Sequence, residues 1–454
     1  MCSMNPDSGS TVQESSTFAG ALQARTQSVL DSCTRCGKCF EVCPMPEPAG
    51  LAGRDAGAVV GGVIDILRGG AGTPDALRWA QVCSGSGHCI PACPEGVNPR
   101  FMLALARVAT QRRAEPVERH RKGVEGFSKM GRGVRVLSRM QLPAEVLRRF
   151  RYPGAGNTPP EVLFYTGCNV LKTPHIVLLV LDIFEAMGIT YDVIGGPGNC
   201  CGVIQFRTAD LESSGRIAYR TTDSFAESGA SNVVAWCPTC TIQLGENVLP
   251  GRADTPYALD AFVVYLASRL EKLRPLLKYP VNKRVALHEH PGVTGVLESA
   301  IRLLKAIPGL DFVEIAQPQA GYMCNTLQPL PEFKRSLHQS LLESAAVAKV
   351  DVLAGVYHAC HRELCSHERD WPFEVVNFLE LIGESMGISR EDRFKRLKKM
   401  QDTDAILADV ADLAGAHGLD LDEVRAVIEQ ELLGEQPLPL RGRHGTRDAG
   451  SAPG

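Results

Sequence analysis

Residues 33–44 read Cys-Thr-Arg-Cys-Gly-Lys-Cys-Phe-Glu-Val-Cys-Pro, which places cysteines at 33, 36, 39 and 43 and a proline at 44. Three thiolates spaced two residues apart wrap a tight loop around one cluster, whereas the fourth lies beyond a helical turn and points towards a second cluster. A structural zinc site needs only four ligands and usually takes them as two distant pairs. The spacing therefore predicts iron–sulfur clusters rather than zinc.

A second run with the same spacing begins at Cys83 and ends at Cys93-Pro94, but Ser86 occupies its second cysteine position. The two runs resemble the two-cluster ferredoxins of bacteria, in which the fourth cysteine of each run binds the other cluster. The resemblance implies a mainly α-helical domain with two clusters. It implies a complete [4Fe-4S] cluster on Cys33, Cys36, Cys39 and Cys93, and a second cluster on Cys43, Cys83 and Cys89.

Ser86 leaves the second cluster one thiolate short, and three outcomes are open. The cluster is [3Fe-4S], it is [4Fe-4S] with the Ser86 oxygen or another non-thiolate ligand, or it is labile. The imidazole of His88 lies nearby in the chain, but we expect it to face solvent. Because a missing thiolate removes negative charge, we expect this cluster to have the higher reduction potential.

A third group of cysteines lies further along the chain, and each member ends or follows a predicted strand. Loops at the carboxyl ends of parallel strands converge on one crevice, so these thiols should meet. Five thiols are more than tetrahedral zinc requires, and a polynuclear iron–sulfur cluster fits better. The five are Cys168, Cys200, Cys201, Cys237 and Cys240.

Residues 161–270 and 284–380 share one pattern of alternating strands and helices. Cys201 and Cys324 are 123 residues apart and Cys240 and Cys360 are 120 apart, so the two segments read as copies of one unit. The alternation predicts an α/β fold with a small parallel sheet, covered by helices, in each copy. The predicted strands are 162–166, 191–194 and 232–236 in the first copy and 284–288, 312–315 and 352–356 in the second, with helices near 174–187, 209–228, 294–307 and 332–349.

The spacing Cys-x31-Cys-Cys-Gly-x34-Cys-x2-Cys, from Cys168 to Cys240, is similar to the CCG domain of heterodisulfide reductase catalytic subunits. The same domain occurs in iron–sulfur subunits of glycolate, lactate and anaerobic glycerol-3-phosphate dehydrogenases. A two-cluster ferredoxin module followed by two such repeats, over residues 30–380, resembles the fused D-type subunit of heterodisulfide reductase. The resemblance implies a noncubane [4Fe-4S] cluster on the five cysteines, although some CCG domains bind zinc instead.

The second copy has lost most of these cysteines. Three cysteines of the first copy align with Pro291, Met323 and Tyr357 in the second. Only Cys324 and Cys360 remain there, as vestigial metal ligands. We favour a structural pseudo-repeat in which these thiols are small buried residues, because imidazoles near strand ends are common without a metal. The alternative is a tetrahedral N/S site completed from Cys365, His288, His290, His358 and His361.

Composition and spacing divide the chain into six parts. A Gly/Pro-rich stretch ends the basic connector, in which Arg132, Arg135 and Arg139 share one helical face and are candidate contacts for a partner. A solvated face is the simpler reading of this charge. The parts are a disordered tail (1–28), the ferredoxin domain (29–115), a basic helical connector (116–160), the two repeats (161–280 and 281–384) and a helical and disordered C-terminal tail (385–454).

The composition narrows the class of protein. Lys and Arg total 48 against 51 Asp and Glu, a net charge of −3 that argues against nucleic-acid binding. Because no secretory signal or membrane-spanning run is seen, we expect a cytoplasmic protein. A peripheral position at the cytoplasmic face of the membrane is the second location that fits these features. No Gly-rich dinucleotide fingerprint follows a predicted strand, so neither NAD nor FAD is expected.

These features favour an iron–sulfur electron-transfer subunit of an oxidoreductase. Its expected partner is a flavoprotein or other redox subunit, or a membrane-associated quinone-linked subunit. The alternative is a catalytic subunit that reduces or forms a thiol/disulfide substrate at the CCG cluster. A weaker third reading is a zinc-stabilised scaffold.

Overall fold

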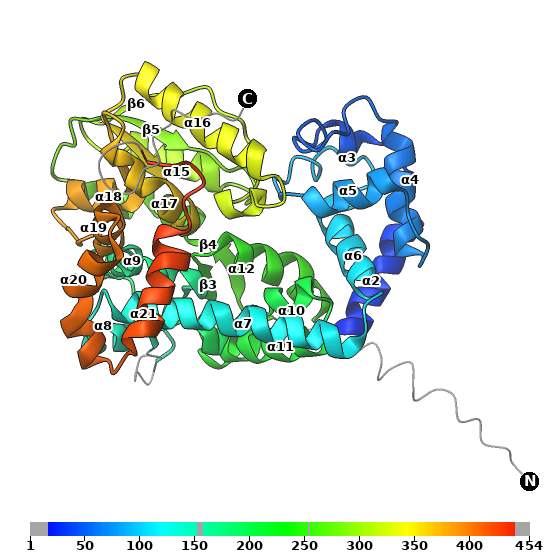
Figure 1. Ribbon diagram of the computed structural model, residues 1–454, viewed down its shortest axis with the longest axis horizontal. Coiled ribbons are helices and arrows are strands. Elements are labelled where there is room, and N and C mark those ends of the chain that lie inside the picture. Colours follow the sequence, from blue (N-terminus) through cyan, green and yellow to red (C-terminus); the bar gives the residue numbers. More distant parts are fainter. Residues whose placement is uncertain (1–16, 152–157, 253–254, 441–454) are drawn as a thin grey trace, which may run out of the picture.

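The computed structural model describes residues 17–151, 158–252 and 255–440 (Figure 1). Two four-stranded parallel sheets form the body of the molecule, and helices from the N-terminal part of the chain stand beside them. The predicted α/β fold with a helical N-terminal region is confirmed. Within the described ranges, no helix combines the length and the apolar character needed to span a bilayer.

The N-terminal helices begin at well-defined caps. The side chain of Asp55 accepts a hydrogen bond from the Ala58 amide at 2.9 Å, and Thr73 and Asn98 cap the next two long helices in the same way. These caps hold the loops between the helices, and the loops carry the cysteines. The helices are α2 (Phe18–Ser32), α3 (Lys38–Glu41), α4 (Ala56–Leu67), α5 (Pro74–Val82) and α6 (Pro99–Gln111).

Part of the segment for which the sequence predicted disorder, residues 1–28, is helical. Helix α2 begins at Phe18 because Thr17 caps it and because Phe18 is buried against Phe206 and Tyr219 of the first sheet unit. A polar stretch can thus fold when its few apolar residues share one helical face. Residues 1–16 lie outside the described residues, as do residues 441–454, for which the sequence also predicted disorder.

The first sheet contains β1 (Val162–Tyr165), β2 (Tyr191–Ile194), β3 (Asn232–Ala235) and β4 (Ala258–Ala261), in the order β2-β1-β3-β4. All four residues of β1 are buried, as expected for a parallel strand covered on both faces. The last residues of the four strands lie in register, so the loops that follow them open at one edge. The helices of this unit are α9 (Pro174–Ala186), α10 (Val203–Arg207), α11 (Leu211–Glu227), α12 (Pro238–Ile242), α13 (Phe262–Ser268) and α14 (Leu270–Leu273).

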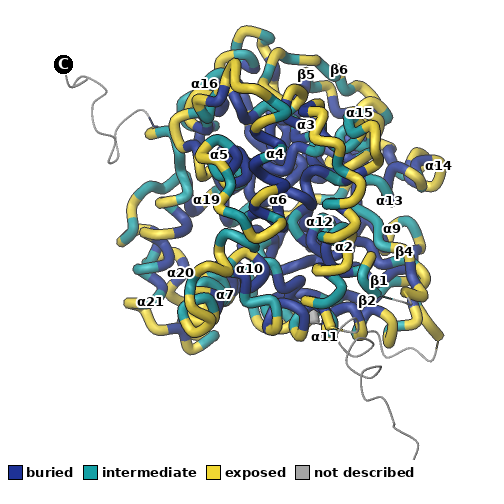
Figure 2. Tube along the Cα trace, turned by 90° about the vertical axis from the view of Figure 1, so that its right-hand side faces the viewer, coloured by how far each residue is buried: buried dark blue, intermediate teal, exposed yellow. Residues whose placement is uncertain are grey.

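The second sheet repeats this topology. Its strands are β5 (Arg284–His288), β6 (Asp311–Phe312), β7 (Val352–Gly355) and β8 (Glu374–Asn377), in the order β6-β5-β7-β8. Figure 2 shows that the buried chain runs through the middle of the molecule and that exposed chain lies at its periphery. The helices of this unit are α15 (Val296–Lys305), α16 (Pro331–Val347), α17 (His358–Leu364) and α18 (Phe378–Met386).

Two details of the sheets differ from the sequence prediction. Strand β6 covers only 311–312 instead of 312–315, because its ladder with β5 stops after Val285 pairs with Phe312. Each sheet also has a fourth strand that the sequence analysis missed. Both β4 and β8 run directly into a helix, at Phe262 and Phe378, so that no turn residue marks the end of the strand.

The described part of the C-terminal segment is helical, as predicted, and shares a small buried core with the connector. Its helices are α19 (Arg393–Met400), α20 (Thr403–Ala416), α21 (Leu421–Val427) and the π-helical turn η9 (Ile428–Leu433). They pack against the connector helix α7 (Pro116–Arg139), which α8 (Ala144–Arg148) follows. Apolar residues recur every third or fourth position and meet in one buried cluster that includes Leu137, Phe394, Ile406, Val424 and Leu432.

The connector uses part of its positive charge within the molecule. Arg135 forms an ion pair with Glu423 of α21, and Arg132 donates a hydrogen bond to Gln430 at 3.3 Å. Two of the three arginines predicted as partner contacts therefore hold the C-terminal helices in the described structure.

Candidate metal centres

The first two cysteine runs meet at two small cavities. One cavity, of about 20 Å³, is lined by the first three cysteines of the first run and by the last cysteine of the second. Burial, together with the neighbouring thiols, raises the pKa of Cys39 to about 12. A thiol here keeps its proton unless a cation replaces it, because a metal ligand must be the thiolate. The donors that fit a four-cysteine cluster are Cys33, Cys36, Cys39 and Cys93.

The second cavity, of about 10 Å³, is lined by Cys43, Cys83, Cys89 and Ser86. Burial raises the pKa of Cys89 to about 12 and that of Cys43 to about 11. The indole Nε1 of Trp79 donates to the Cys43 Sγ at 3.4 Å. Ser84 lines the same space, so three thiols and two serines surround it, which fits a cluster with three thiolates.

The backbone places Ser86 in its loop as it places Cys36 in the first loop. Arg35 and Gly85, the residues before them, have φ values of 61° and 75°, and the glycines after them both have φ of 83°. Such positive values are rare outside glycine, so their recurrence at both positions indicates one shared loop conformation. Ser86 is buried, whereas Cys36 is exposed.

The five cysteines of the third group form one continuous set of sulfur contacts. Side-chain hydrogen bonds join Cys168 to Cys200, Cys200 to Cys201, Cys201 to Cys240 and Cys240 to Cys237. All five are buried. Hydrogen bonding with neighbouring thiols lowers the pKa of Cys200 and raises those of Cys168 and Cys201. A set of five adjacent sulfurs exceeds what one tetrahedral zinc ion takes up and fits a polynuclear cluster.

Glycines allow these loops to approach one another. Gly202 follows the paired cysteines with φ of 75°, and a Cβ there would lie 2.6 Å from the Ser214 carbonyl oxygen. At Gly167, with φ of 70°, a Cβ would lie 3.0 Å from the Cys237 Cβ and 3.1 Å from the Cys240 Sγ. Both positions need glycine because their positive φ values disfavour other residues and because a Cβ atom would be too close to its neighbours.

Comparisons with known proteins agree with this geometry. The pattern of the CCG cysteine-rich domain matches residues 162–245. The chain is 22% identical over 404 residues to the D subunit of the dihydromethanophenazine:CoB–CoM heterodisulfide reductase of Methanosarcina acetivorans, a match that covers 80% of this chain and 95% of that protein. It is 25% identical over 377 residues to the B subunit of the fumarate reductase (CoM/CoB) of Methanothermobacter marburgensis, a match that covers 78% of this chain and 72% of that protein.

The chain contains a CCG cysteine-rich domain and is similar over most of its length to heterodisulfide reductase D subunits. It is an iron–sulfur oxidoreductase subunit. The corresponding D subunit of Methanosarcina mazei is 22% identical over 401 residues, which are 79% of this chain and 94% of that protein, so the likeness extends well beyond the CCG domain.

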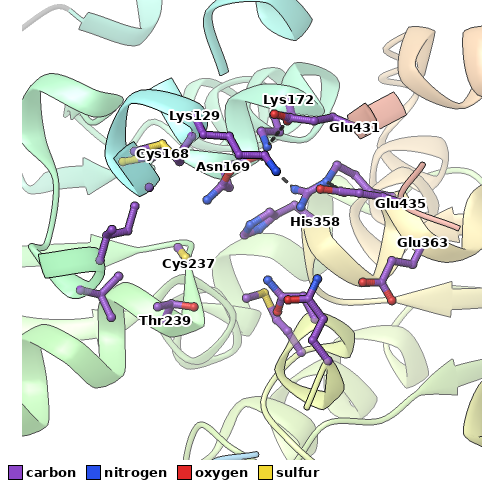
Figure 3. Close-up of a pocket in the computed structure, with 18 of the residues that line it drawn as sticks. Lys129, Cys168, Asn169, Lys172, Cys237, Thr239, His358, Glu363, Glu431 and Glu435 are labelled. Atoms are coloured by element: carbon purple, nitrogen blue, oxygen red, sulfur yellow. Dashed lines mark hydrogen bonds and ion pairs between the residues drawn. The ribbon is translucent and has the colours of Figure 1, made fainter. Parts of the chain in front are cut away.

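The five cysteines of this CCG-domain protein line a cavity of about 590 Å³ between the two sheet units and the C-terminal segment. Figure 3 shows Cys168 and Cys237 on one side of it and the carboxylates Glu363 and Glu435 on the other. The lining includes three carboxylates and twice as many cations. These cations are Lys129, Lys172, Arg207, Lys334, Arg335 and Arg362.

Each carboxylate of the cavity is paired with a cation. Lys172 contacts Glu431 at 2.6 Å, Lys334 contacts Glu363 at 2.7 Å and Arg362 contacts Glu435 at 2.7 Å. Of the other three cations of the lining, Arg335 contacts Glu332 on its own helix at 3.6 Å, which leaves Lys129 and Arg207 in excess of the carboxylates. The cavity has a surplus of positive charge next to the cysteines and suits an anionic ligand.

In the second unit, Cys324 and Cys360 lie together with His288 and His290, which the sequence analysis set aside in favour of a structural pseudo-repeat. The other candidates for this site lie elsewhere. The His361 Nε2 donates to the Asp392 carboxylate at 2.6 Å, His358 lines the large cavity, and Cys365 is buried in the C-terminal core. Local sequence patterns place all four histidines near strand ends, and only the packing of the loops selects His288 and His290 from the five candidates.

Proposed function

We propose that this protein passes electrons between a partner redox subunit and the five-cysteine site at the large cavity. The partner that we propose is a flavoprotein dehydrogenase or another redox subunit, or a membrane-associated quinone-linked subunit. The proposed ligands are Cys33, Cys36, Cys39 and Cys93 for the first cluster, Cys43, Cys83, Cys89 and the doubtful Ser86 for the second, and Cys168, Cys200, Cys201, Cys237 and Cys240 for the third.

The spatial order of the three thiol groups carries this proposal. The thiolate of Cys39, in the first cavity, is close enough to Cys89, in the second, to raise the pKa of that thiol. On the other side, a cavity of about 440 Å³ extends from Cys83 to Val203 and Thr239. Val203 and Thr239 also line the five-cysteine cavity. The three groups are thus neighbours in one row, as stepwise electron transfer requires.

The side chains of this chain hold and insulate the sites. Bound iron–sulfur clusters supply one-electron transfer. Of the proposed thiol ligands, Cys36 is exposed, four are half-buried and the others are buried, which limits the access of water to the sites. We propose that the partner docks where Cys36 reaches the surface and that the five-cysteine site lies at the other end of the row.

The proposal can be tested by metal analysis and EPR spectroscopy of the full chain purified under nitrogen. We expect roughly eleven to twelve irons per chain and three distinguishable signals. Cys36→Ser should alter only the first signal and Cys237→Ser only the third, with four irons lost at most. Roughly eight irons in the wild type, with zinc bound to sulfur alone, would place a structural metal at the five-cysteine site and contradict the proposal.

The large cavity favours a second candidate function, which is reduction or formation of a thiol/disulfide substrate beside the five cysteines. In the direction of reduction, two electrons from the partner and two protons convert one disulfide into two thiols. The relatives named above include proteins that act on the CoB–CoM heterodisulfide. For this chain, the surplus charge at Lys129 and Arg207 favours a disulfide or thiol that carries an anionic group.

This candidate can be tested with reduced methyl viologen and a pair of disulfides, one carboxylated and one neutral. Lys129→Ala should raise KM for the carboxylated disulfide about tenfold, since a charged hydrogen bond contributes on the order of 1.5 kcal/mol. The matched control is Lys122→Ala on the same helix, where the amine contacts Glu118 at the surface. No disulfide-dependent oxidation of the viologen by protein with a full iron content would reject this candidate and leave the relay.

A further inference from the structure

Four potential ligands meet in the second sheet unit, away from the five cysteines. They are His288, His290, Cys324 and Cys360, and their ligand atoms all lie within 4.8 Å of one another. The Cys324 Sγ lies 3.1 Å from the His288 Nε2 and 3.5 Å from the His290 Nε2. The exposed fraction of these side chains is 5% or less.

The loops of the repeated unit bring the four together. His288 is the last residue of β5, and β5 pairs with β7, so that His288 lies beside Gly355. Helix α17 starts three residues after Gly355 and carries Cys360, while Cys324 begins a short 3-10 turn after β6. The site is therefore at the carboxyl edge of the second sheet, the edge that carries the five cysteines in the first.

Hydrogen bonds fix both imidazoles with the Nε2 lone pair towards the thiols. The His290 Nδ1 lies 2.8 Å from the Ala320 carbonyl oxygen, which can only accept, so this nitrogen carries the proton. The His288 Nδ1 lies 3.3 Å from the Oε1 of Gln317. That oxygen is identified because the Gln317 amide donates to the Leu287 carbonyl at 2.8 Å and its oxygen accepts from the Glu289 amide at 3.0 Å. Such outer contacts orient histidine ligands in metal sites.

The distances and the charge match a single tetrahedral ion. A zinc ion at ordinary bond lengths would separate two sulfurs and two nitrogens by about 3.3–3.8 Å. The Cys324–His290 contact of 3.5 Å lies within this range, and the Cys324–His288 contact of 3.1 Å lies slightly below it. A two-iron cluster would place the imidazole pair and the thiolate pair on different irons and further apart. Two thiolates, two neutral imidazoles and Zn²⁺ have no net charge, which suits a buried position.

We propose that His288, His290, Cys324 and Cys360 bind one structural zinc ion through their Nε2 and Sγ atoms, with release of two thiol protons. Four protein ligands leave no open position for a substrate. The ion joins β5, the turn after β6 and α17. Residues on either side of Cys324 and Cys360, namely Met323, Asn325, His358 and Arg362, line the five-cysteine cavity, so the zinc ion holds one wall of that cavity in place.

The test uses the full chain, purified under nitrogen with its iron, and does not depend on the proposed electron-transfer function. We expect about one zinc ion per chain, with two sulfurs at about 2.3 Å and two nitrogens at about 2.0 Å in zinc X-ray absorption. Cys324→Ala and His290→Ala should lose the zinc. His290→Cys should keep it with three sulfurs and one nitrogen, which separates a ligand from a residue needed only for packing.

Two controls locate the zinc ion. Cys365→Ala removes a buried thiol outside the site and should leave the zinc content unchanged. Cys237→Ser should lower the iron content and leave the zinc content as it is, because Cys237 belongs to the five-cysteine set. The proposal is overturned if the wild type neither contains zinc nor takes it up from added Zn²⁺, or if its zinc has only sulfur neighbours and is lost with Cys237.

Discussion

Arg100 of α6, which is buried, forms an ion pair with the half-buried Glu246, which lies 146 residues further along the chain. The Arg100 Nε donates to the Glu246 Oε2 at 3.1 Å, and its Nη1 donates to the Gly85 carbonyl at 2.8 Å. The same Nη1 also donates to the carbonyl of Gly292 in the second unit. One guanidinium thus joins the loop of Ser86 to both sheet units, at the place where we propose that electrons cross.

Replacement of Arg100 by methionine should destabilise the protein by about 3 kcal/mol, because it leaves the Glu246 carboxylate and two buried carbonyls without their donor. The measurement is the urea midpoint of unfolding under nitrogen. Arg121→Met is the control, since Arg121 pairs with Glu118 and Glu125 on the exposed face of α7 and such pairs contribute little. Equal midpoints for the two variants would show that the Arg100–Glu246 pair does not hold the units together.

Ser86→Cys should change the second cluster. The loop conformation matches that around Cys36, so a thiol at residue 86 should supply the missing ligand. We expect a gain of about one iron per chain where the wild type has [3Fe-4S], and a lower reduction potential because a thiolate adds negative charge. The readouts are iron analysis and an EPR redox titration.

Ser86→Ala is the companion variant for that experiment. It should behave as the wild type if the serine oxygen is not a ligand, and should lose one iron if it is. A Ser86→Cys protein with unchanged iron content and unchanged potential would contradict the prediction that the two loops are equivalent.

Gly202→Ala should disrupt the five-cysteine site. Alanine disfavours the φ of 75° found there, and its Cβ would lie 2.6 Å from the backbone oxygen of Ser214. We expect a loss of about 2 kcal/mol in stability and loss of the iron bound by the CCG domain, measured by unfolding and by iron content. Gly198→Ala in the preceding turn has no atom within 4 Å of the added Cβ and should keep both.

The carboxylate of Glu435 should make stability depend on pH in acid. Burial alone would raise its pKa, but Arg362 and Lys172 outweigh that effect and hold the pKa at about 2, below the ordinary value of 4.5. A depressed folded pKa means that the stabilisation is complete above about pH 4.5 and is lost as the pH falls towards 2. The shift corresponds to at most about 3 kcal/mol.

Glu435→Gln tests this prediction. The variant should be less stable than the wild type at pH 7, and the difference should shrink between pH 4.5 and pH 2, as followed by urea unfolding. Because acid also protonates the thiolate ligands and releases iron, the two proteins are compared at equal iron content, so that the difference between them isolates this carboxylate. The exposed Glu429→Gln serves as control, and a Glu435→Gln difference that stays constant across this range would contradict the assignment.

Short apolar runs predicted most of the strands within one residue. Strands β1, β2 and β3 end at or one residue before their predicted limits, because parallel strands buried on both faces read as continuous apolar segments. The prediction failed where local signals are absent. Helix α2 depends on Phe18 packing against Phe206, and β4 and β8 depend on pairing with β3 and β7.

The sequence by itself determined which residues can share a loop. The spacing of Cys33, Cys36 and Cys39 places three thiols on one loop, independently of how the rest of the chain folds. Cys200 and Cys201 are adjacent because they follow one another in the chain. Contacts at this range depend only on local backbone geometry. Local apolar patterns likewise predict the alternation of strands and helices and its repeat.

The tertiary structure alone decided which loops meet. His288 and Cys360 are 72 residues apart in the chain and come together because β5 pairs with β7 in a register that puts His288 beside Gly355. The Nδ1 partner of each histidine, which decides whether its Nε2 can bind a metal, also comes from about thirty residues away. Such contacts follow from how sheets and helices pack, and no pattern within one segment contains them.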